Sequence, residues 1–303
     1  MRTQAFALTL ACLAGILQSA RAAQASAITA AMLCATPRPL VIAHRGFSAA
    51  APENTLPAFE LALAVESDLI ELDVHQTQDG QLVVIHDATL DRTTDAQKRW
   101  GRKHVSVGSV TAAALAELDA GAWFHPRYSG TRIPTLHDAL RTISSRGGRT
   151  LIERKTGNPA SFTQLLRALN LMDQVVVQSF DWSFLRSLRR IEPQLLLGAL
   201  GPPDLLPDGT QPDKLARTLH STWIELAQET GATILIWNHR HLHAQSTAEV
   251  QSRGLKLWVY TVNEPADFET ALHRGVNGII TDQPARLWRY LALRTNPHTQ
   301  PAK

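Results

Sequence analysis

The chain has 303 residues, of which 44% are hydrophobic and 19% are charged, and it contains 17 glycines, 16 prolines and two cysteines. This balance is typical of a globular fold of one or two domains and excludes collagen-like, low-complexity and disulfide-rich scaffolds. The formal net charge of +3 is too small for a basic surface that binds nucleic acid, so we expect no nucleic-acid partner.

Residues 1–22 predict a secretory signal peptide. Arg2 gives a basic start, an apolar run extends over residues 5–17, and Ala20-Arg21-Ala22 is a small-x-small cleavage site. The apolar run is shorter than the roughly 20 residues that span a bilayer. We therefore expect an exported protein, periplasmic or secreted, with no stable insertion into the membrane.

The two cysteines bear on how the mature chain is held. Cys12 lies inside the apolar run and leaves a lipid anchor as an alternative, although Thr9 stands where such anchors have an aliphatic residue. Cleavage after Ala22 would remove Cys12 and lower the formal charge from +3 to +1. Cys34 would then be alone, so no intramolecular disulfide is expected even in an oxidising compartment.

After an N-terminal segment at 23–39, short apolar runs alternate with amphipathic segments. Helical spacing follows most of the runs, as in LPAFELALAVE, FTQLLRALNL, WSFLRSLRRI, LARTLHSTWIELAQE and PADFETALHRG. The candidate strands are 40–46, 69–75, 82–87, 150–155, 175–180, 195–200, 233–238, 257–263 and 278–282.

Repeated βα units of this kind predict an α/β fold with a parallel sheet. About eight units over residues 40–295 favour a closed (β/α)8 TIM barrel over an open sheet. No GxGxxG follows the first strand, which weakens a dinucleotide-binding alternative. Nine candidate strands exceed eight places, and the run at 233–238 is the weakest of them.

A Gly-rich and charged stretch at about 88–133 interrupts the alternation, with one short helix expected around 112–118. It is too long for an ordinary βα loop, so it predicts a small insertion after the third strand, at the rim that carries active sites in such barrels. Residues 296–303 are expected to be a C-terminal tail.

Three carboxylates fall on strand positions that share a face. Alternation puts Glu71, Asp73 and His75 on one face of the second candidate strand, and Glu153 and Lys155 on one face of the fourth. Buried carboxylates must be paired or bind a cation, and an all-oxygen set favours one divalent cation, Mg²⁺ or Ca²⁺. The alternative is a salt-bridged face exposed to solvent.

Two histidines, His44 and His86, end apolar strands at the edge where barrel enzymes keep catalytic groups. Such a pair suits general acid and base catalysis, and Arg45 offers a planar fork for a phosphate or a carboxylate. The alternative for a single histidine at a strand end is a structural role.

These residues stand within motifs that resemble the glycerophosphodiester phosphodiesterase family over about residues 40–287. The motifs occur in the same order as in the family: HRGFSAAAPENTLPAF, ELDVHQTQDGQLVVIHDATLDRTT, RIPTLHDAL, IERK, VVVQSFD, VYTVNEP and GIITDQP. The resemblance implies a TIM barrel with an insertion after the third strand, and metal-dependent hydrolysis of glycerophosphodiesters to glycerol 3-phosphate and an alcohol.

The resemblance also implies a role for each motif residue in this sequence. The implied acid and base are His44 and His86, the implied phosphate ligands are Arg45 and Lys155, the implied metal ligands are Glu71, Asp73 and Glu153, and Glu53 is implied near the metal or behind its ligands.

The sequence departs from the family pattern at Tyr260, where Trp is usual in the substrate wall, at Asn277 and at Asp138. The insertion is also variant, and its Trp100 and Trp123 are candidates for the pocket that takes the alcohol.

The spacing of His239, His241 and His243 is compatible with a soft metal site, but no cysteine or carboxylate lies nearby in the sequence to complete it. Two functional alternatives stay open: a lysophospholipase D-like activity on lipids, and a non-catalytic protein that binds phosphodiesters. The sequence does not predict an oligomeric state.

Overall fold

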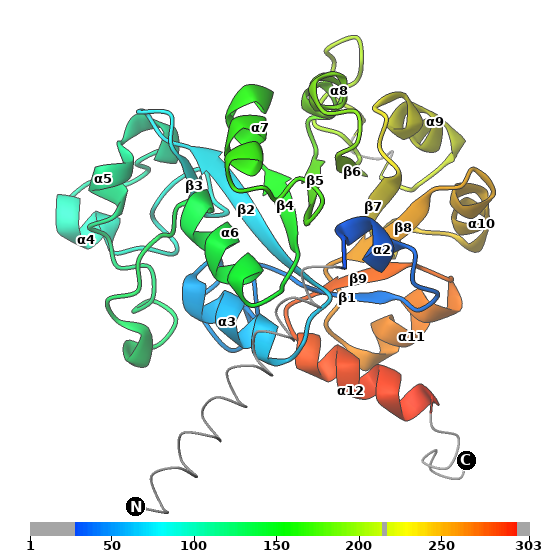
Figure 1. The fold of residues 1–303 in the computed structure, drawn as a ribbon, viewed down its shortest axis with the longest axis horizontal. Coiled ribbons are helices and arrows are strands. Elements are labelled where there is room, and N and C mark those ends of the chain that lie inside the picture. Colours follow the sequence, from blue (N-terminus) through cyan, green and yellow to red (C-terminus); the bar gives the residue numbers. More distant parts are fainter. Residues whose placement is uncertain (1–27, 214–216, 296–303) are drawn as a thin grey trace, which may run out of the picture.

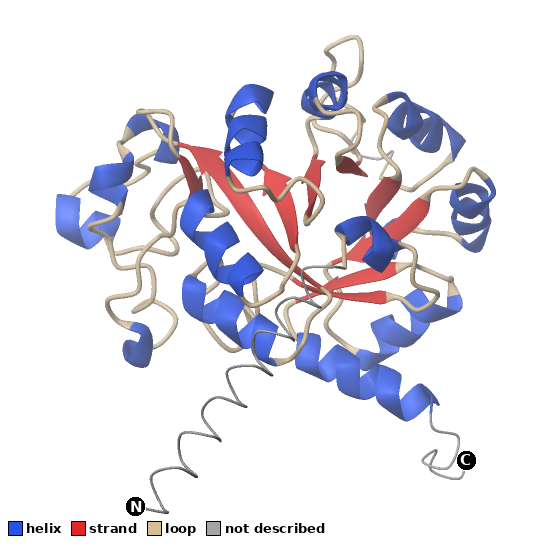
Figure 2. Cartoon of the chain, in the orientation of Figure 1, coloured by secondary structure: helices blue, strands red, loops and turns tan. Residues whose placement is uncertain are grey.

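The protein is described by a computed structural model that covers residues 28–213 and 217–295. The predicted signal peptide, with Cys12, and the C-terminal tail lie outside the described residues. Strands form a central ring and helices surround it (Figures 1 and 2). Within the described residues no helix is long and apolar enough to cross a membrane.

The ring is a closed barrel of eight parallel strands. Neighbours follow the order β1-β9-β8-β7-β6-β5-β4-β2, and pairing between β1 and β2 closes the ring. The strands are β1 (Leu40–Ala43), β2 (Leu69–Gln76), β4 (Thr150–Arg154), β5 (Val175–Ser179), β6 (Leu196–Gly201), β7 (Ile234–Asn238), β8 (Lys256–Tyr260) and β9 (Gly278–Thr281). The run at 233–238, the weakest candidate, is therefore a barrel strand, β7.

A helix follows each barrel strand before the chain returns to the next one, as right-handed βα units require. These helices are α3 (Leu56–Ala64), α6 (Leu136–Ser145), α7 (Pro159–Ala168), α8 (Trp182–Ile191), α9 (Ser221–Glu229), α10 (Ala244–Ser252), α11 (Pro265–His273) and α12 (Pro284–Thr295). The predicted TIM barrel is confirmed.

Side-chain alternation along the strands separates two cores. On β2, Ile70, Leu72 and Val74 face outward and pack with the helices, while Glu71 and Asp73 face the barrel interior. The interior below the carboxylates is filled by apolar side chains, among them Leu40, Ile42, Leu69, Leu151, Val176, Ile234, Trp258 and Ile280. The barrel interior is thus packed, and the buried carboxylates lie toward its carboxyl end.

A short helix that the sequence patterns did not reveal covers the other end of the barrel. Helix α2 (Ala30–Cys34) begins at Thr29, whose side chain accepts a hydrogen bond from the amide of Met32. Ala30 is fully buried, and Leu33 and Cys34 pack against the interior cluster. In Figure 1 this helix lies over the middle of the strand ring.

The run at 82–87 is not a barrel strand. Only Leu82–Val84 forms a strand, β3, and it pairs antiparallel to the end of β2 after a turn at residues 77–81. The surplus run among the nine candidates is therefore 82–87 and not 233–238, because an apolar run of this length looks the same in a parallel strand and in a short hairpin.

The insertion therefore follows the third strand in the chain, but lies between the second and third strands of the barrel. It contains α4 (Ala96–Trp100), α5 (Ala112–Leu115) and two short 3-10 turns, Val107–Ser109 and Pro126–Tyr128. Its own small core packs around Leu90, Val107, Leu115 and Leu118. Figure 1 shows it beside β3, outside the ring of helices.

Candidate active site

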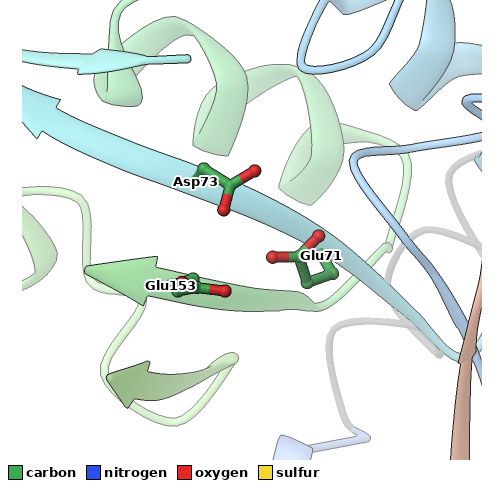
Figure 3. Close-up of side chains that lie close together, drawn as sticks. All are labelled: Glu71, Asp73 and Glu153. Atoms are coloured by element: carbon green, nitrogen blue, oxygen red, sulfur yellow. The ribbon is translucent and has the colours of Figure 1, made fainter. Parts of the chain in front are cut away.

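Three carboxylates meet inside the carboxyl end of the barrel. Asp73 and Glu153 lie opposite each other in the pairing of β2 with β4. Glu71 lies two residues before Asp73 on β2, on the same face of the strand. Figure 3 shows the three carboxylates gathered between the two strands. One ligand oxygen from each lies within 4.8 Å of the others. Glu71 and Asp73 are each 1% exposed and Glu153 is 8% exposed, so the cluster is shielded from bulk water.

The protonation of the three groups is unequal. Burial and the neighbouring Asp73 raise the pKa of Glu153 to about 7, although Lys155 opposes this rise. Burial also raises the pKa of Glu71 well above its ordinary value, with Asp73 and Glu153 adding to the effect. Burial alone would raise the pKa of Asp73, but Lys155 and Arg45 together hold it well below its usual range. Like charges in one site push the pKa values apart.

The donor set fits a hard divalent ion. Glu71 Oε1 and Asp73 Oδ1 are buried and make no hydrogen bond with residues 28–213 or 217–295, although Lys155 Nζ lies 3.2 Å from Asp73 Oδ1. A buried oxygen without a hydrogen-bond partner is costly, and a cation satisfies it. The cluster could therefore hold one Mg²⁺ or Ca²⁺ ion through carboxylate oxygens.

Asn54, which was not singled out from the sequence although it lies in the motif HRGFSAAAPENTLPAF, fixes one of these carboxylates. Its amide nitrogen Nδ2 donates to Asp73 Oδ2 at 2.8 Å, and the backbone amide of Asp73 donates to Asn54 Oδ1 at 3.1 Å. Its neighbour Glu53, which the resemblance implied near the metal or behind its ligands, accepts hydrogen bonds from Arg45 and Arg92. The PENT motif therefore serves the site through two different contacts.

Arg45 follows β1 in a turn that depends on Gly46. Gly46 has φ +80°, and a Cβ there would lie 2.7 Å from the backbone carbon of Ala58, so helix α3 leaves room only for glycine. The turn directs the amide of Arg45 at Glu71 Oε2, 2.8 Å away, and its guanidinium at Glu53 Oε1, also 2.8 Å away. Arg45 is therefore held beside the carboxylate cluster.

Lys155 approaches the cluster from the end of β4. Its ammonium forms an ion pair with Glu153 as well as with Asp73. Burial alone would lower the pKa of Lys155, but these two carboxylates raise it above its ordinary value. Arg45 and Lys155 thus add two positive charges at the edge of the cluster, where a phosphate is attracted.

His44 is oriented by Asp282, which the sequence patterns did not single out as a site residue. His44 Nδ1 lies 2.6 Å from Asp282 Oδ1. Ser48 Oγ donates to the same oxygen, and Asn263 Nδ2 donates to Asp282 Oδ2 at 2.6 Å. Burial alone would raise the pKa of Asp282, but the contact with His44 helps lower it to about 2. The only signal in the sequence was the motif GIITDQP.

His86 is oriented in the same manner from the other side of the cavity. Its Nδ1 lies 2.7 Å from Asp87 Oδ1. Arg92, from the insertion, donates to both oxygens of Asp87 and to both oxygens of Glu53. The hydrogen bond from Arg92 is the main cause of the lowered pKa of Asp87. A single side chain of the insertion therefore links the carboxylate behind His86 with the carboxylate behind Arg45.

We predict that Arg92→Ala lowers kcat by up to about 10²-fold. Asp87 and Glu53 would lose their shared partner, so the side chains they orient, His86 and Arg45, could shift, and a displacement of about 1 Å can cost that much. Loss of the positive charge should also raise the pKa of His86 and move the matching limb of the pH–rate profile to higher pH. Arg99→Ala is the control, since Arg99 pairs with the exposed Glu117 on the same insertion. Equal profiles for both variants would contradict the prediction.

The predicted residues line one cavity of about 340 Å³. Both histidines, Arg45, Lys155, two of the carboxylates and Tyr260 reach it, and the remaining wall is largely apolar. The full lining is His44, Arg45, Glu71, His86, Glu153, Lys155, Gln178, Phe180, Leu200, Tyr260, Thr261 and Ile280. The chain thus brings cations, acids and titratable imidazoles to one opening at the carboxyl end of the barrel.

Other residues considered from the sequence lie elsewhere. Trp100 packs in the core of the insertion, and Trp123 is 40% exposed with its indole nitrogen bonded to the carbonyl of Ala120. Neither lines the cavity. His75 shares the face of Asp73 but bonds to the carbonyl of His86.

The three histidines at 239–243 form no metal cluster with neighbouring ligands in the part of the chain that the structure describes. They lie beyond the end of β7, in or just after a 3-10 turn at His239–His241. His239 is buried, and its carbonyl accepts a hydrogen bond from Arg274.

A TIM barrel with histidines, cationic side chains and a carboxylate cluster at its carboxyl end has the groups that metal-assisted cleavage of a phosphodiester requires. The sequence matches the Glycerophosphoryl diester phosphodiesterase family over residues 44–286. The chain belongs to this family, a family of phosphoric diester hydrolases, which confirms the family and the enzyme class that the motifs predicted.

Individual relatives agree. The chain is similar to a glycerophosphodiester phosphodiesterase of Caldanaerobacter subterraneus subsp. tengcongensis, with 34% identity over 82% of this chain and 96% of the relative. It is also similar to a glycerophosphodiester phosphodiesterase of Bacillus subtilis, with 31% identity over 86% of this chain and 88% of the relative.

Solved structures show the same architecture. A phosphodiesterase from Oleispira antarctica, in complex with the product sn-glycerol-3-phosphate, is 25% identical with a TM-score of 0.72, and covers 84% of this chain and 97% of its own. A glycerophosphodiester phosphodiesterase from Agrobacterium tumefaciens is 27% identical with a TM-score of 0.65, and covers 82% and 98%.

Proposed function

We propose that the protein hydrolyses glycerophosphodiesters to glycerol 3-phosphate and an alcohol, with the help of one divalent cation. The observation that carries this proposal is the arrangement of three buried carboxylates, two cations and two oriented histidines around one cavity. The names of the relatives, and the product in the Oleispira structure, support the substrate class.

In this proposal the phosphate is bound jointly by the cation, Arg45 and Lys155. Glu71, Asp73 and Glu153 hold the cation, which can be Mg²⁺ or Ca²⁺. When bound, the cation supplies positive charge beside the phosphoryl oxygens. Arg45 and Lys155 bind the same oxygens from the edge of the cluster and stabilise the charge that builds there during cleavage.

The contacts of the histidines specify which ring nitrogen reacts. Nδ1 of His44 and Nδ1 of His86 each face a carboxylate, so each carries its proton there and leaves Nε2 for the substrate. One histidine takes a proton from the nucleophile, which is water or the 2-hydroxyl of the glycerol. The other gives a proton to the departing alkoxide.

The proposal is tested with a panel of soluble diesters, with Ca²⁺, Mg²⁺ or EDTA. We expect glycerophosphocholine to be cleaved in the presence of a divalent ion, and different alcohol groups to be accepted. Diesters without glycerol, such as bis(p-nitrophenyl) phosphate, should be poor substrates. Comparable kcat/KM for bis(p-nitrophenyl) phosphate and glycerophosphocholine would contradict the glycerol specificity.

The same panel separates the two alternatives. Faster cleavage of lysophospholipid micelles than of any soluble diester would favour a lysophospholipase D-like enzyme. If glycerophosphocholine binds but is not cleaved with either Ca²⁺ or Mg²⁺, a non-catalytic binding protein is favoured.

We also propose that the protein is exported and cleaved near Ala22, on the strength of the basic start and the apolar run in the sequence. The expected result is a mature chain that begins at about Ala23 and is found in the periplasm or the medium. Intact mass and cell fractionation check this. Full-length protein in the cytoplasm, or lipid on Cys12, would contradict it.

A further inference from the structure

Gln178 carries a polar atom that no residue in the described part of the chain satisfies. It is 1% exposed, and its side-chain Oε1 is buried without a hydrogen-bond partner among those residues. It also lines the cavity that holds the two histidines. Buried side-chain oxygens are nearly always paired in folded proteins, so an unpaired one in a cavity wall points to a ligand that donates to it.

The strand register places Gln178 inside the barrel. It lies on β5, paired with Glu153 of β4 on one side and with Gly198 of β6 on the other. A Cβ at Gly198 would lie 3.3 Å from the Cβ of Gln178 and 2.7 Å from a methyl carbon of Ile236, so the glycine leaves the room that the amide needs.

The polar side chains nearby have other partners among the described residues. The hydroxyl of Tyr260 donates to the carbonyl of Gly201 at 3.1 Å, and the ammonium of Lys155 pairs with Glu153 and Asp73. The rest of the nearby wall is apolar, with Phe180 and Leu200. Since no described side chain bonds to Gln178 Oε1, a hydroxyl of the occupant of the cavity can supply the donor.

The position of β5 favours the substrate over the cation as that occupant. In the sheet order, β4 stands between β2 and β5, so Glu153 lies between the β2 carboxylates and Gln178. Neighbouring strands are about 4.8 Å apart, which puts Gln178 two strand spacings from Glu71 and Asp73. Glu153 and Gln178 line the same cavity, so a substrate bound next to Glu153 can contact Gln178.

We propose that Gln178 is the residue that recognises a hydroxyl of the glycerol moiety, which donates its hydrogen bond to Oε1. This inference rests on the proposed function and names the side chain responsible for its glycerol specificity. A site built to bond a hydroxyl discriminates strongly against an analogue that lacks it, because the polar atom of the protein then stays unpaired.

The test compares the wild type with Gln178→Leu, which keeps the approximate shape and removes the amide. The two substrates are glycerophosphocholine and propyl phosphocholine, which is the same diester without the hydroxyls of the glycerol. We expect the wild type to prefer the first, and Gln178→Leu to lose roughly 10- to 100-fold of that preference in kcat/KM. The variant should lose activity chiefly on the glycerol substrate.

Two further measurements separate recognition from a structural role. Gln178→Leu should have a Tm equal to or above that of the wild type, because it removes an unpaired buried oxygen. Ser179→Ala is the matched control on the same strand: Ser179 Oγ donates to the carbonyl of Arg154 from the opposite face. This control should lower the Tm and leave the substrate preference unchanged.

Calorimetry supplies a readout that needs no turnover. Wild-type protein should bind sn-glycerol 3-phosphate more tightly than propyl phosphate, and Gln178→Leu should bind them equally. If Gln178→Leu keeps the preference for glycerophosphocholine over propyl phosphocholine, the inference is overturned and the proposed function stays intact. A selective loss of Ca²⁺ or Mg²⁺ affinity in that variant has the same consequence. If the wild type cleaves no diester, the proposed function fails and the binding comparison still decides the role of Gln178.

Discussion

Glu71→Gln, Asp73→Asn and Glu153→Gln should each lower kcat/KM by about 10³-fold or more, since a cation beside a phosphoryl group contributes several kcal/mol and each 1.4 kcal/mol is tenfold. EDTA should reduce the wild type to a similar level. Because the three oxygens lie within 4.8 Å of one another, no single carboxylate is spare. The measurement is initial rate on glycerophosphocholine at saturating Mg²⁺ or Ca²⁺.

The same variants should reveal the cation through stability. Ligands that bind only the folded state raise its Tm, so added divalent ion should stabilise the wild type and leave the three variants unchanged. Glu60→Gln is the control, since Glu60 is an exposed carboxylate on α3 that pairs with Arg146. Full activity after exhaustive EDTA treatment, or an equal Tm response in Asp73→Asn, would refute metal binding at this cluster.

The pH dependence of the Tm of the metal-free protein is a further test of the same site. Burial and Asp73 raise the pKa of Glu153 to about 7, so the folded state keeps a proton there that the unfolded state loses near pH 4.5. Stability falls with rising pH wherever the folded state binds more protons. The Tm of Glu153→Gln, relative to the metal-free wild type, should therefore rise between about pH 5 and pH 7. Divalent ions should bind more tightly as the pH rises, because the ligands must be deprotonated.

The sequence predicts the barrel because strand and helix periods are local properties. Alternation along 69–75 requires Glu71 and Asp73 to share a face, and the apolar residues between them require that the other face be packed against helices. The structure shows both. The number of barrel strands was harder, because an apolar run such as 82–87 does not reveal whether its partner runs parallel or antiparallel.

Residues that act through others were missed for a different reason. Asp282 lies 238 positions from His44 in the sequence, and Asn54 lies 19 positions from Asp73, so neither pairing leaves a spacing pattern. Helix α2 was missed because a segment of five residues is too short to show a helical period. In the sequence Gln178 is one polar residue in an apolar strand, and it stands out only because its buried Oε1 has no partner among the described residues.

His44→Ala and His86→Ala should each lower kcat by about 10² to 10⁴, the usual contribution of a positioned general acid or base. His44 and His86 have side-chain exposures of 18% and 32% and lie at the rim, outside the apolar clusters, so both variants should fold. His137→Ala is the control, since His137 is an exposed residue on α6 that pairs with its neighbour Asp138. Circular dichroism and kcat on glycerophosphocholine are the measurements.

A change of leaving group tells the two histidines apart. A diester of glycerol phosphate with p-nitrophenol needs little protonation of the departing oxygen, so it should partly rescue the variant that lost the acid. The variant that lost the base should stay slow, because the nucleophile still has to give up a proton. Since Nδ1 of each ring faces its own carboxylate, Asp282→Asn should imitate the weaker defect of a misoriented His44, and Asp87→Asn that of His86. If both alanine variants are folded and keep a kcat near that of the wild type, proton transfer by these two histidines is wrong.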